Sequence, residues 1–359
     1  MDERKRVAAL IRDYIARERM SREQFAFKAK LGKSTVDKLL TGLFSDKTLA
    51  AVEGRTGLQL RRHDAPEGLA APGRAAPAEA VPRHEVTFHR APDGVCLAVA
   101  SAGEGPVVVK TANWLNHLEQ DWRGPVWGPL LRRLSSKLRV VRYDGRGNGL
   151  SDREVADISF AAFVRDLEAV VDGLGLERFA LFGASQGAAI AIAYAAAHPE
   201  RVSRIVLHGA YAQGRNRRGS EAERELARTF LTMIRQGWGD EHSAFVRAFA
   251  SIFFPAATPE QLQAWVELQR LATSADTAVR LRAACDEIDV TGLLGAVRAP
   301  TLVLHNRHDS VAPLDQARRI AAGIAGAHFV ELESDNHVVL EGEAAWPRFI
   351  AEIERFLAS

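Results

Sequence analysis

The 359-residue chain has two cysteines, Cys96 and Cys285, and lacks any run of about 18 apolar residues. Two cysteines exclude a disulfide framework and a paired Cys-x-x-Cys metal site, and the missing apolar run excludes a membrane-spanning helix. The N-terminal stretch MDERKRVAALIRDYIARERM has no apolar signal-peptide core. We therefore expect a cytoplasmic protein with no membrane contact, no metal and no cofactor.

Charge divides unevenly along the chain, although the net charge is only +2. Residues 1–62 contain 15 Lys and Arg against 8 Asp and Glu, whereas the rest contains 32 against 37. This asymmetry predicts a small basic module that meets a polyanion and a larger acidic module with another task. Between them, residues 61–83 are rich in Ala, Pro and Gly and predict a linker. We expect domains at 1–60 and 84–359.

The first module has the patterns of a small helical bundle. Ser21 and Gln24 fit a capping box at the start of a second helix, and KSTVDKLL and SDKTLAAVEGRTG predict a third and a fourth. The first helix is predicted by an apolar stripe with helical spacing, formed by Val7, Leu10, Ile11, Tyr14 and Ile15.

After residue 84, short apolar runs alternate with helical segments, which predicts a doubly wound α/β domain. From the third onward the strands are nearly continuous apolar runs, as expected of a parallel sheet buried on both faces. A long, mostly helical insertion rich in aromatics is expected at about 215–295. The eight strands are predicted at EVTFHR, CLAVASAG, PVVVKTA, LRVVRYDG, RFALFGA, SRIVLHGA, APTLVLHNR and HFVELES.

Ser185 lies in the stretch FALFGASQGAAIAIAYAAA, between a predicted buried strand and a helix of small residues. Gly-x-Ser-x-Gly in this setting is typical of a nucleophile elbow, where a sharp, strained turn lifts the serine Oγ above the sheet. Gly183 and Gly187 allow strand and helix to approach closely. Such turns are common in α/β proteins, so the interpretation depends on partners for the serine.

The partners follow in chain order. Asp309 comes just after the seventh predicted strand and His337 just after the eighth. Ser, then Asp, then His, each at the carboxyl end of a strand, is the chain order expected of a catalytic triad on this kind of sheet. Plainer interpretations stay open at this point: His305 and His308 lie nearby and could be simple loop or core histidines, and Asp309 could be only the N-cap of the helix that contains LDQARRI.

With these motifs, residues 84–359 resemble the α/β-hydrolase family. The stretch TANWLNHLEQDWRGPVWGPLLRRLSSKLRVVRYDGRGNGLSD is similar to hydrolase domains fused to transcriptional regulators and nucleotide cyclases. The resemblance implies oxyanion donors at the backbone N–H groups of Trp114 and Gln186. Where many relatives have His-Gly before the donor, this chain has Ala112-Asn113.

A serine nucleophile argues against the dehalogenase and epoxide hydrolase branches of that family, which use aspartate. It leaves hydrolysis of an ester, a thioester, a lactone or an activated C–C bond, and the triad does not choose among them. We do not interpret GRGNG, at 145–149, as a dinucleotide site, nor FKAKLGKST as a phosphate loop, because neither has the required glycines in the required context.

The first module resembles the Cro and phage-repressor type of helix-turn-helix. In that geometry KSTVDKLL is the recognition helix, so the resemblance implies that Lys33, Ser34, Thr35 and Lys38 contact double-stranded DNA and that the protein is a homodimer. Small basic bundles also serve as protein-docking domains. Two functions therefore remain: a serine hydrolase joined to a DNA-binding domain, or a transcriptional regulator that senses a small acyl effector.

Overall fold

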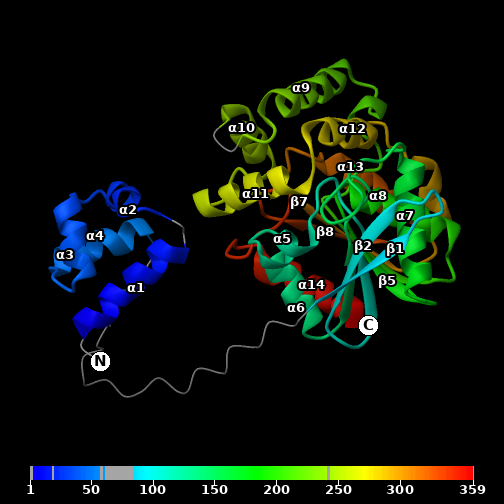
Figure 1. Cartoon of the computed structure of the whole chain (residues 1–359). Helices are drawn as coiled ribbons and strands as arrows, with labels where there is room; N and C mark the ends of the chain where they lie inside the picture. The colour runs from blue at the N-terminus through cyan, green and yellow to red at the C-terminus, as the bar shows by residue number, and fades with distance from the viewer. Residues whose placement is uncertain (1–2, 18–19, 57–59, 61–83, 241–242, 359) are drawn as a thin grey trace. The chain divides into compact units, whose positions relative to one another are not determined.

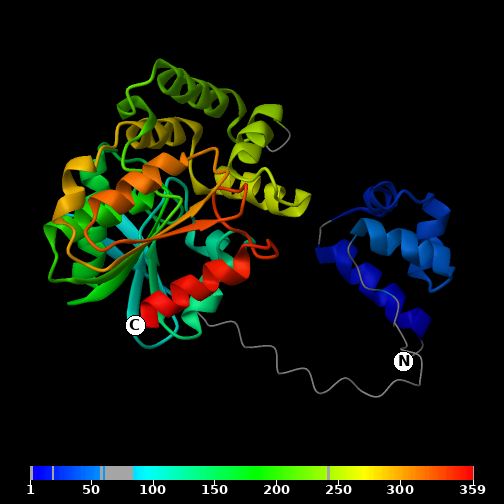
Figure 2. The ribbon, with the colours of Figure 1, turned by 180° about the vertical axis from the view of Figure 1, so that it is seen from behind.

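The computed structural model describes residues 3–17, 20–56, 60, 84–240 and 243–358. The chain divides into two compact units, Met1–Glu79 and Ala80–Ser359 (Figure 1; Figure 2 from behind). The predicted linker at 61–83 lies outside the described residues. Within the described ranges, no helix is long and apolar enough to cross a membrane.

The first unit consists of helices α1 (Glu3–Arg17), α2 (Arg22–Ala29), α3 (Lys33–Leu40) and α4 (Asp46–Thr56). The Ser21 side chain accepts from the Gln24 N–H, and the Gln24 side chain accepts from the Ser21 N–H, so α2 begins at a full capping box. It ends at Lys30, which has φ 49° and turns the chain toward α3. The helices enclose an apolar cluster that includes Ile11, Phe25, Val36, Leu39 and Val52.

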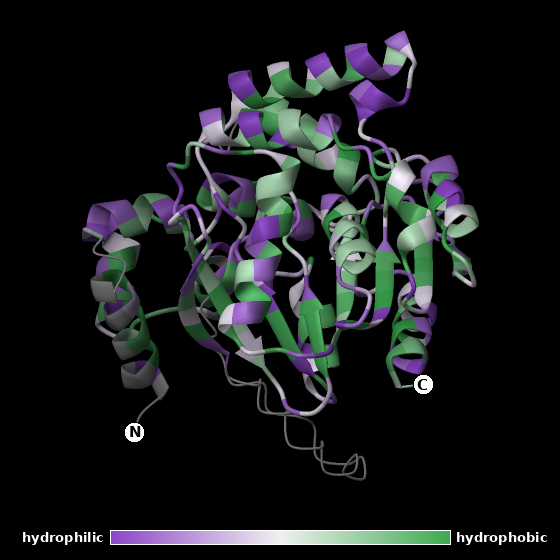
Figure 3. Ribbon diagram, turned by 90° about the vertical axis from the view of Figure 1, so that its right-hand side faces the viewer, coloured by the Kyte–Doolittle hydropathy of each residue, from purple (hydrophilic) through white to green (hydrophobic). Residues whose placement is uncertain are grey.

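The second unit is built on one eight-stranded sheet with the order β1-β2-β4-β3-β5-β6-β7-β8. Only the β1–β2 and β2–β4 pairs are antiparallel. The sheet confirms the predicted eight-stranded, mostly parallel architecture, and its strands are largely hydrophobic (Figure 3). The strands are β1 (Glu85–Arg90), β2 (Cys96–Ala102), β3 (Val107–Lys110), β4 (Arg139–Tyr143), β5 (Phe179–Ala184), β6 (Val202–His208), β7 (Thr301–Asn306) and β8 (His328–Leu332).

Helices cover both faces of this sheet (Figure 1). One face carries α5 (Leu118–Arg123), α6 (Gly128–Ser135) and α14 (Trp346–Ala358), and the other carries α7 (Phe160–Gly173), α8 (Gln186–Ala197) and α13 (Leu314–Gly323). Glu354 of α14 pairs with Arg133 of α6 at 2.5 Å and with Lys137 at 2.7 Å. Because both faces are covered, every residue of β5 and β7 is buried.

Between β6 and β7 the chain forms the helical segment expected at 215–295, which lies above the sheet in Figure 1 and which we name the cap. Thr258 and Gln261 form a capping box at the start of α11. The cap comprises η1 (Arg215–Arg217), α9 (Glu221–Gly237), α10 (Ala244–Phe253), α11 (Pro259–Ala272), α12 (Ala275–Asp286) and η2 (Thr291–Ala296).

Candidate active site

Ser185 occupies a strained turn between β5 and α8. Its backbone has φ 53° and ψ −125°, and among the described non-glycine residues only Lys30 shares a positive φ. Such a conformation costs on the order of 1–3 kcal/mol and persists only where the surroundings hold it. The Ser185 N–H donates to the His208 carbonyl at 2.9 Å, which anchors the turn to the end of β6.

The flanking glycines are needed for this turn because neither site has room for a side chain. A Cβ at Gly183 would lie 2.7 Å from the Ala188 Cα. A Cβ at Gly187 would lie 2.6 Å from the Thr111 Oγ1 and 2.8 Å from the Ala112 carbonyl oxygen. With glycine at positions 183 and 187, β5, α8 and the loop after β3 lie closer together than a residue with a side chain would permit.

Asp309 and His337 are in direct contact. The His337 Nδ1 and the Asp309 Oδ2 are 2.7 Å apart, and both side chains are buried. The other carboxylate oxygen accepts from the N–H groups of Val311 and Ala312. Since the Nδ1–H of His337 donates to the carboxylate, its Nε2 is free to act as a base, and this buried atom has no hydrogen-bond partner among the described residues.

The three residues predicted as a triad follow strands that end at the same edge of the sheet. Ser185 follows β5, Asp309 follows β7 and His337 follows β8, and these strands are parallel with β6 between the first two. Gly209, just after β6, lies beside His337, since a Cβ there would be 3.1 Å from the His337 Cε1. The same strand end accepts the Ser185 N–H through the His208 carbonyl, so the end of β6 lies beside both the Ser185 backbone and the His337 ring.

His305 and His308 differ in their surroundings, and His305 also lies near the proposed acid, with its Nε2 3.8 Å from the Asp309 Oδ2. His305 is buried, its Nε2 lies 2.9 Å from the Ala312 carbonyl, and burial lowers its pKa. His308 is exposed beside Glu333. Asp309 does not cap α13, because Pro313 occupies that position. Of the two histidines near Asp309, His337 makes the shorter contact, at 2.7 Å.

The loop after β3, residues 111–117, lies against the elbow. The Thr111 Oγ1 donates to the Gly187 carbonyl at 2.7 Å, and the Asn148 side chain donates to the Trp114 carbonyl at 3.4 Å. Gln186 is the first residue of α8, where backbone N–H groups lack partners within the helix. The two backbone positions expected as oxyanion donors, at Trp114 and Gln186, therefore belong to segments tied to each other.

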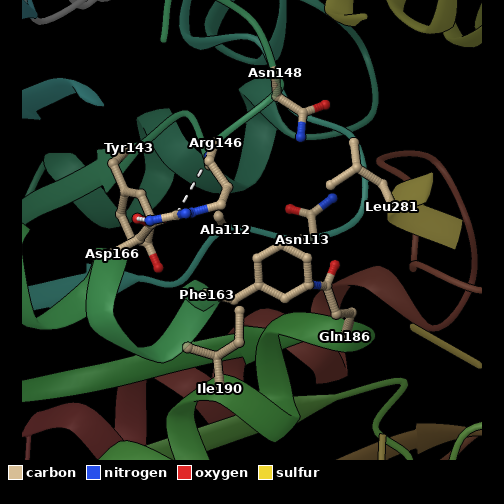
Figure 4. A pocket seen from close by; sticks show the side chains of 11 residues that line it. Ala112, Asn113, Tyr143, Arg146, Asn148, Phe163, Asp166, Gln186, Ile190 and Leu281 are labelled. Atoms are coloured by element: carbon tan, nitrogen blue, oxygen red, sulfur yellow. Dashed lines mark hydrogen bonds and ion pairs between the residues drawn. The ribbon is translucent and has the colours of Figure 1, made fainter. Parts of the chain in front are cut away.

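A small pocket lies beside this loop, and Figure 4 shows Asn113 and Gln186 among the side chains that line it. Arg146, from the GRGNG segment, is buried at its edge and pairs with Asp166 and Asp93, each at 2.7 Å. Arg146 thus has a structural role there. These contacts are not predictable from a local motif, because the partners lie 20 and 53 positions away along the chain.

The cap contacts the site through the end of α10. The Phe253 ring stacks on the Trp114 ring at 5.8 Å and meets the His337 ring edge-on at 5.7 Å. The His337 N–H donates to the Phe253 carbonyl at 2.7 Å, and the Ser310 hydroxyl donates to the Ile252 carbonyl. The sequence indicated only that some cap aromatics could face a pocket, and Phe253 is the one in contact with His337.

The residues predicted to contact DNA all lie on α3 of the first unit. Lys33, Ser34 and Lys38 are exposed, and Thr35 is half-buried. The Lys33 Nζ lies 2.7 Å from the Glu23 carboxylate. Both partners of this ion pair are exposed, so it contributes little to stability.

Comparisons with known proteins agree with this architecture. A family model described as alpha/beta hydrolase fold matches residues 114–344. An AB hydrolase superfamily protein, YisY, of Bacillus subtilis is 29% identical over 70% of this chain and 91% of its own length. A pyrrolizixenacetamide deacetylase of Xenorhabdus hominickii is 28% identical over 65% of this chain and 85% of its own.

Among solved structures, an esterase from Exiguobacterium antarcticum superimposes with a TM-score of 0.63, at 24% identity, over 76% of this chain and 99% of the esterase. The chain therefore belongs to the alpha/beta hydrolase fold family. Its relatives are named as hydrolases and deacetylases, and it is itself an enzyme of the hydrolase class.

Proposed function

We propose that the chain is a serine hydrolase that cleaves a small acyl compound through an acyl-enzyme. The observation that carries this proposal is the 2.7 Å contact between His337 Nδ1 and Asp309 Oδ2, at the sheet end where the strained elbow presents Ser185. The substrate classes that fit are an ester, a thioester or a lactone. The relative named as a deacetylase supports acyl transfer as the chemistry.

In this mechanism Ser185 Oγ attacks the acyl carbon while His337 Nε2 accepts its proton. Asp309 holds the imidazole orientation and stabilises the imidazolium. The backbone N–H groups of Trp114 and Gln186 stabilise the oxyanion. Loss of one such donor raises the activation free energy by about 2.7–4 kcal/mol. The imidazolium then protonates the leaving group. In the second half His337 deprotonates a water, which attacks the acyl carbon and releases Ser185 and the acid.

Labelling with a fluorophosphonate tests the nucleophile directly, because the reagent forms a covalent bond with an activated serine. We expect the label on Ser185 in the wild type and none in Ser185→Ala. Turnover of short-chain aryl esters should fall by roughly three orders of magnitude or more in that variant. A Ser185→Ala protein with wild-type turnover contradicts the proposal.

We further propose that the first unit is a helix-turn-helix domain that binds double-stranded DNA as a homodimer. In this second function the protein is a transcriptional regulator, and its hydrolase unit binds, and slowly hydrolyses, a small acyl effector. The basic charge of residues 1–62 and the exposed Lys33, Ser34 and Lys38 on α3 favour it. Helix-turn-helix domains of the repressor type usually bind DNA operators made of two paired half-sites, which favours a homodimer.

A mobility-shift assay on DNA upstream of the protein's own gene, with salt varied and with candidate acyl ligands, tests this second function. Lys38→Ala should weaken binding and reduce the salt slope by about 1, as expected for one lost phosphate contact. Lys137→Ala, a lysine of the hydrolase unit, is the matched control. Absence of binding at low salt contradicts the proposal.

A further inference from the structure

Lys110, the last residue of β3, is a buried lysine that the proposed chemistry does not use. It is 4% exposed, and its Nζ lies 4.3 Å from the centre of the Trp127 ring. Lysines are almost never buried to this degree without a partner. Burial lowers the Lys110 pKa to about 8, and the nearby carboxylates of Asp121 and Asp144 oppose that shift. A cation kept in such a place needs a structural reason.

The side chain of Asn113 supplies that reason, because it is the direct hydrogen-bond partner of Lys110. The Lys110 Nζ donates to the Asn113 Oδ1 at 2.6 Å, and the Asn113 Nδ2 donates to the Leu115 carbonyl at 2.7 Å. The Asn113 amide group thus forms one hydrogen bond with Lys110, which precedes Trp114 in the chain, and another with the backbone of Leu115, which follows it. Asn113 is itself buried, so water does not compete for either bond.

These bonds act on the segment whose backbone matters most in the proposed mechanism. The Trp114 N–H belongs to the peptide unit that Asn113 begins. The Trp114 ring is held differently, since it packs on Phe253 and Phe249 of the cap. The sheet therefore controls the backbone through Lys110 and Asn113, and the cap controls the ring.

Resting on the proposed serine-hydrolase function, we infer that Lys110 and Asn113 are positioning residues that act as one unit, orienting the Trp114 N–H toward the oxyanion. A charged donor makes the stronger kind of hydrogen bond and holds the amide in a single orientation. Since an oxyanion donor acts on the transition state and not on the bound substrate, loss of its orientation lowers kcat more than it changes KM.

A double-mutant cycle tests this inference. Lys110→Met removes the charged donor with little change in length, and Asn113→Leu removes both hydrogen bonds of the amide. We expect kcat to fall roughly 10- to 100-fold in each variant, with KM changed by less than about threefold. The double variant should lose about as much as the larger single loss, because the two side chains act together. Lys110→Gln, which keeps a neutral donor, should recover part of kcat.

The kcat values are divided by the number of serines titrated to completion with a fluorophosphonate. A purely structural role would lower the number of active molecules and leave kcat per labelled serine unchanged. Lys137→Met, at an exposed lysine bonded to Glu354, is the matched control and should behave as the wild type. If Lys110→Met does not fold, Lys110→Gln and Asn113→Leu provide the same comparison.

Two negative outcomes are distinguishable. Wild-type kcat per labelled serine in Lys110→Met and Asn113→Leu, with activity still dependent on Ser185, overturns only this inference, as do independent, multiplying losses in the double variant. Turnover that survives in Ser185→Ala contradicts the proposed function and this inference together.

Discussion

Gly187 shows at the scale of one residue how tightly the elbow is built. At a solvent-exposed helix position, a Gly→Ala substitution stabilises the folded state by about 1 kcal/mol through helix propensity. Here the added Cβ would lie 2.8 Å from the backbone oxygen of Ala112 and 2.6 Å from the Thr111 Oγ1, so the loop after β3 must move. We expect Gly187→Ala to lose about 1–3 kcal/mol of unfolding free energy and roughly 100-fold in kcat/KM.

Steady-state hydrolysis of an aryl acetate and urea unfolding measure the two effects of Gly187→Ala. Gly292→Ala is the matched control, because a Cβ at that glycine meets no atom within 4 Å. Unchanged kcat/KM in Gly187→Ala would show that the loop tolerates displacement and that the elbow does not need this glycine.

His208 predicts how stability depends on pH. It is fully buried beside the ring of Phe349, and burial, with smaller contributions from the nearby His337 and His305, lowers its pKa to about 3. The unfolded chain, in which histidine has a pKa near 6.5, therefore takes up this proton first as pH falls. Folding free energy is lost as pH drops below about 6.5 and down to about 3, at up to about 1.4 kcal/mol per pH unit.

Urea unfolding at pH 7, 6 and 5 measures this slope. His208→Gln keeps a polar group that can accept from the Val339 N–H, as the His208 Nε2 does at 3.4 Å, but it does not titrate. The variant is expected to be less stable at pH 7 and to show a shallower loss between pH 6 and 5. Parallel pH profiles for the two proteins would mean that His208 is not buried neutral.

Residue by residue, the sequence predicted those parts of the candidate site that are local or ordered along the chain. The Gly-x-Ser-x-Gly motif predicts Ser185, and the position of Asp309 and His337 just after apolar strands predicts both of them. Lys110 and Asn113 were not identified as a pair. A buried lysine at a strand end looks like a surface residue until the packing of Trp127 against it is known, and that packing is a tertiary contact.

At the scale of elements, the strands were predictable and the packing of the cap was not. The apolar runs of the parallel strands specify burial on both faces, whereas the helices of the cap are amphipathic and could pack in several ways. Only the structure shows that the end of α10 contacts both the loop with Asp309 and the loop with His337. The same contacts predict that α10 limits the size of the acyl group.

Phe253 is the side chain of α10 expected to set this limit, since its ring contacts both the Trp114 and the His337 rings. Phe253→Leu should open space there, and the ratio of kcat/KM for an octanoyl ester to that for an acetyl ester is expected to rise about tenfold. Phe245→Leu is the control, because Phe245 lies on the same helix and is 50% exposed. An unchanged ratio would place the acyl group elsewhere.

At the scale of the whole molecule, the change in composition and charge near residue 60 predicted a division of the chain. The structure divides it into Met1–Glu79 and Ala80–Ser359, and the described residues of each unit form an apolar cluster of their own. Composition indicates such a boundary because the sequence at 61–83 is rich in Ala, Pro and Gly and lacks the apolar periodicity typical of helices and strands. It does not predict what one unit does to the other.

The two clusters predict that the hydrolase unit works alone. Ser185, Asp309, His337 and the loop after β3 all belong to the second unit, whose large apolar cluster contains only its own residues. A protein consisting of residues 80–359 is therefore expected to fold cooperatively and to keep kcat/KM for an aryl acetate within about twofold of the full chain. Circular dichroism and steady-state kinetics on the two proteins measure this.

The same fragment should bind no DNA, because Lys33, Ser34 and Lys38 lie outside it. A folded fragment with a tenfold or greater loss of kcat/KM would show that the first unit takes part in the chemistry, and DNA binding by the fragment would place the nucleic-acid surface on the hydrolase unit.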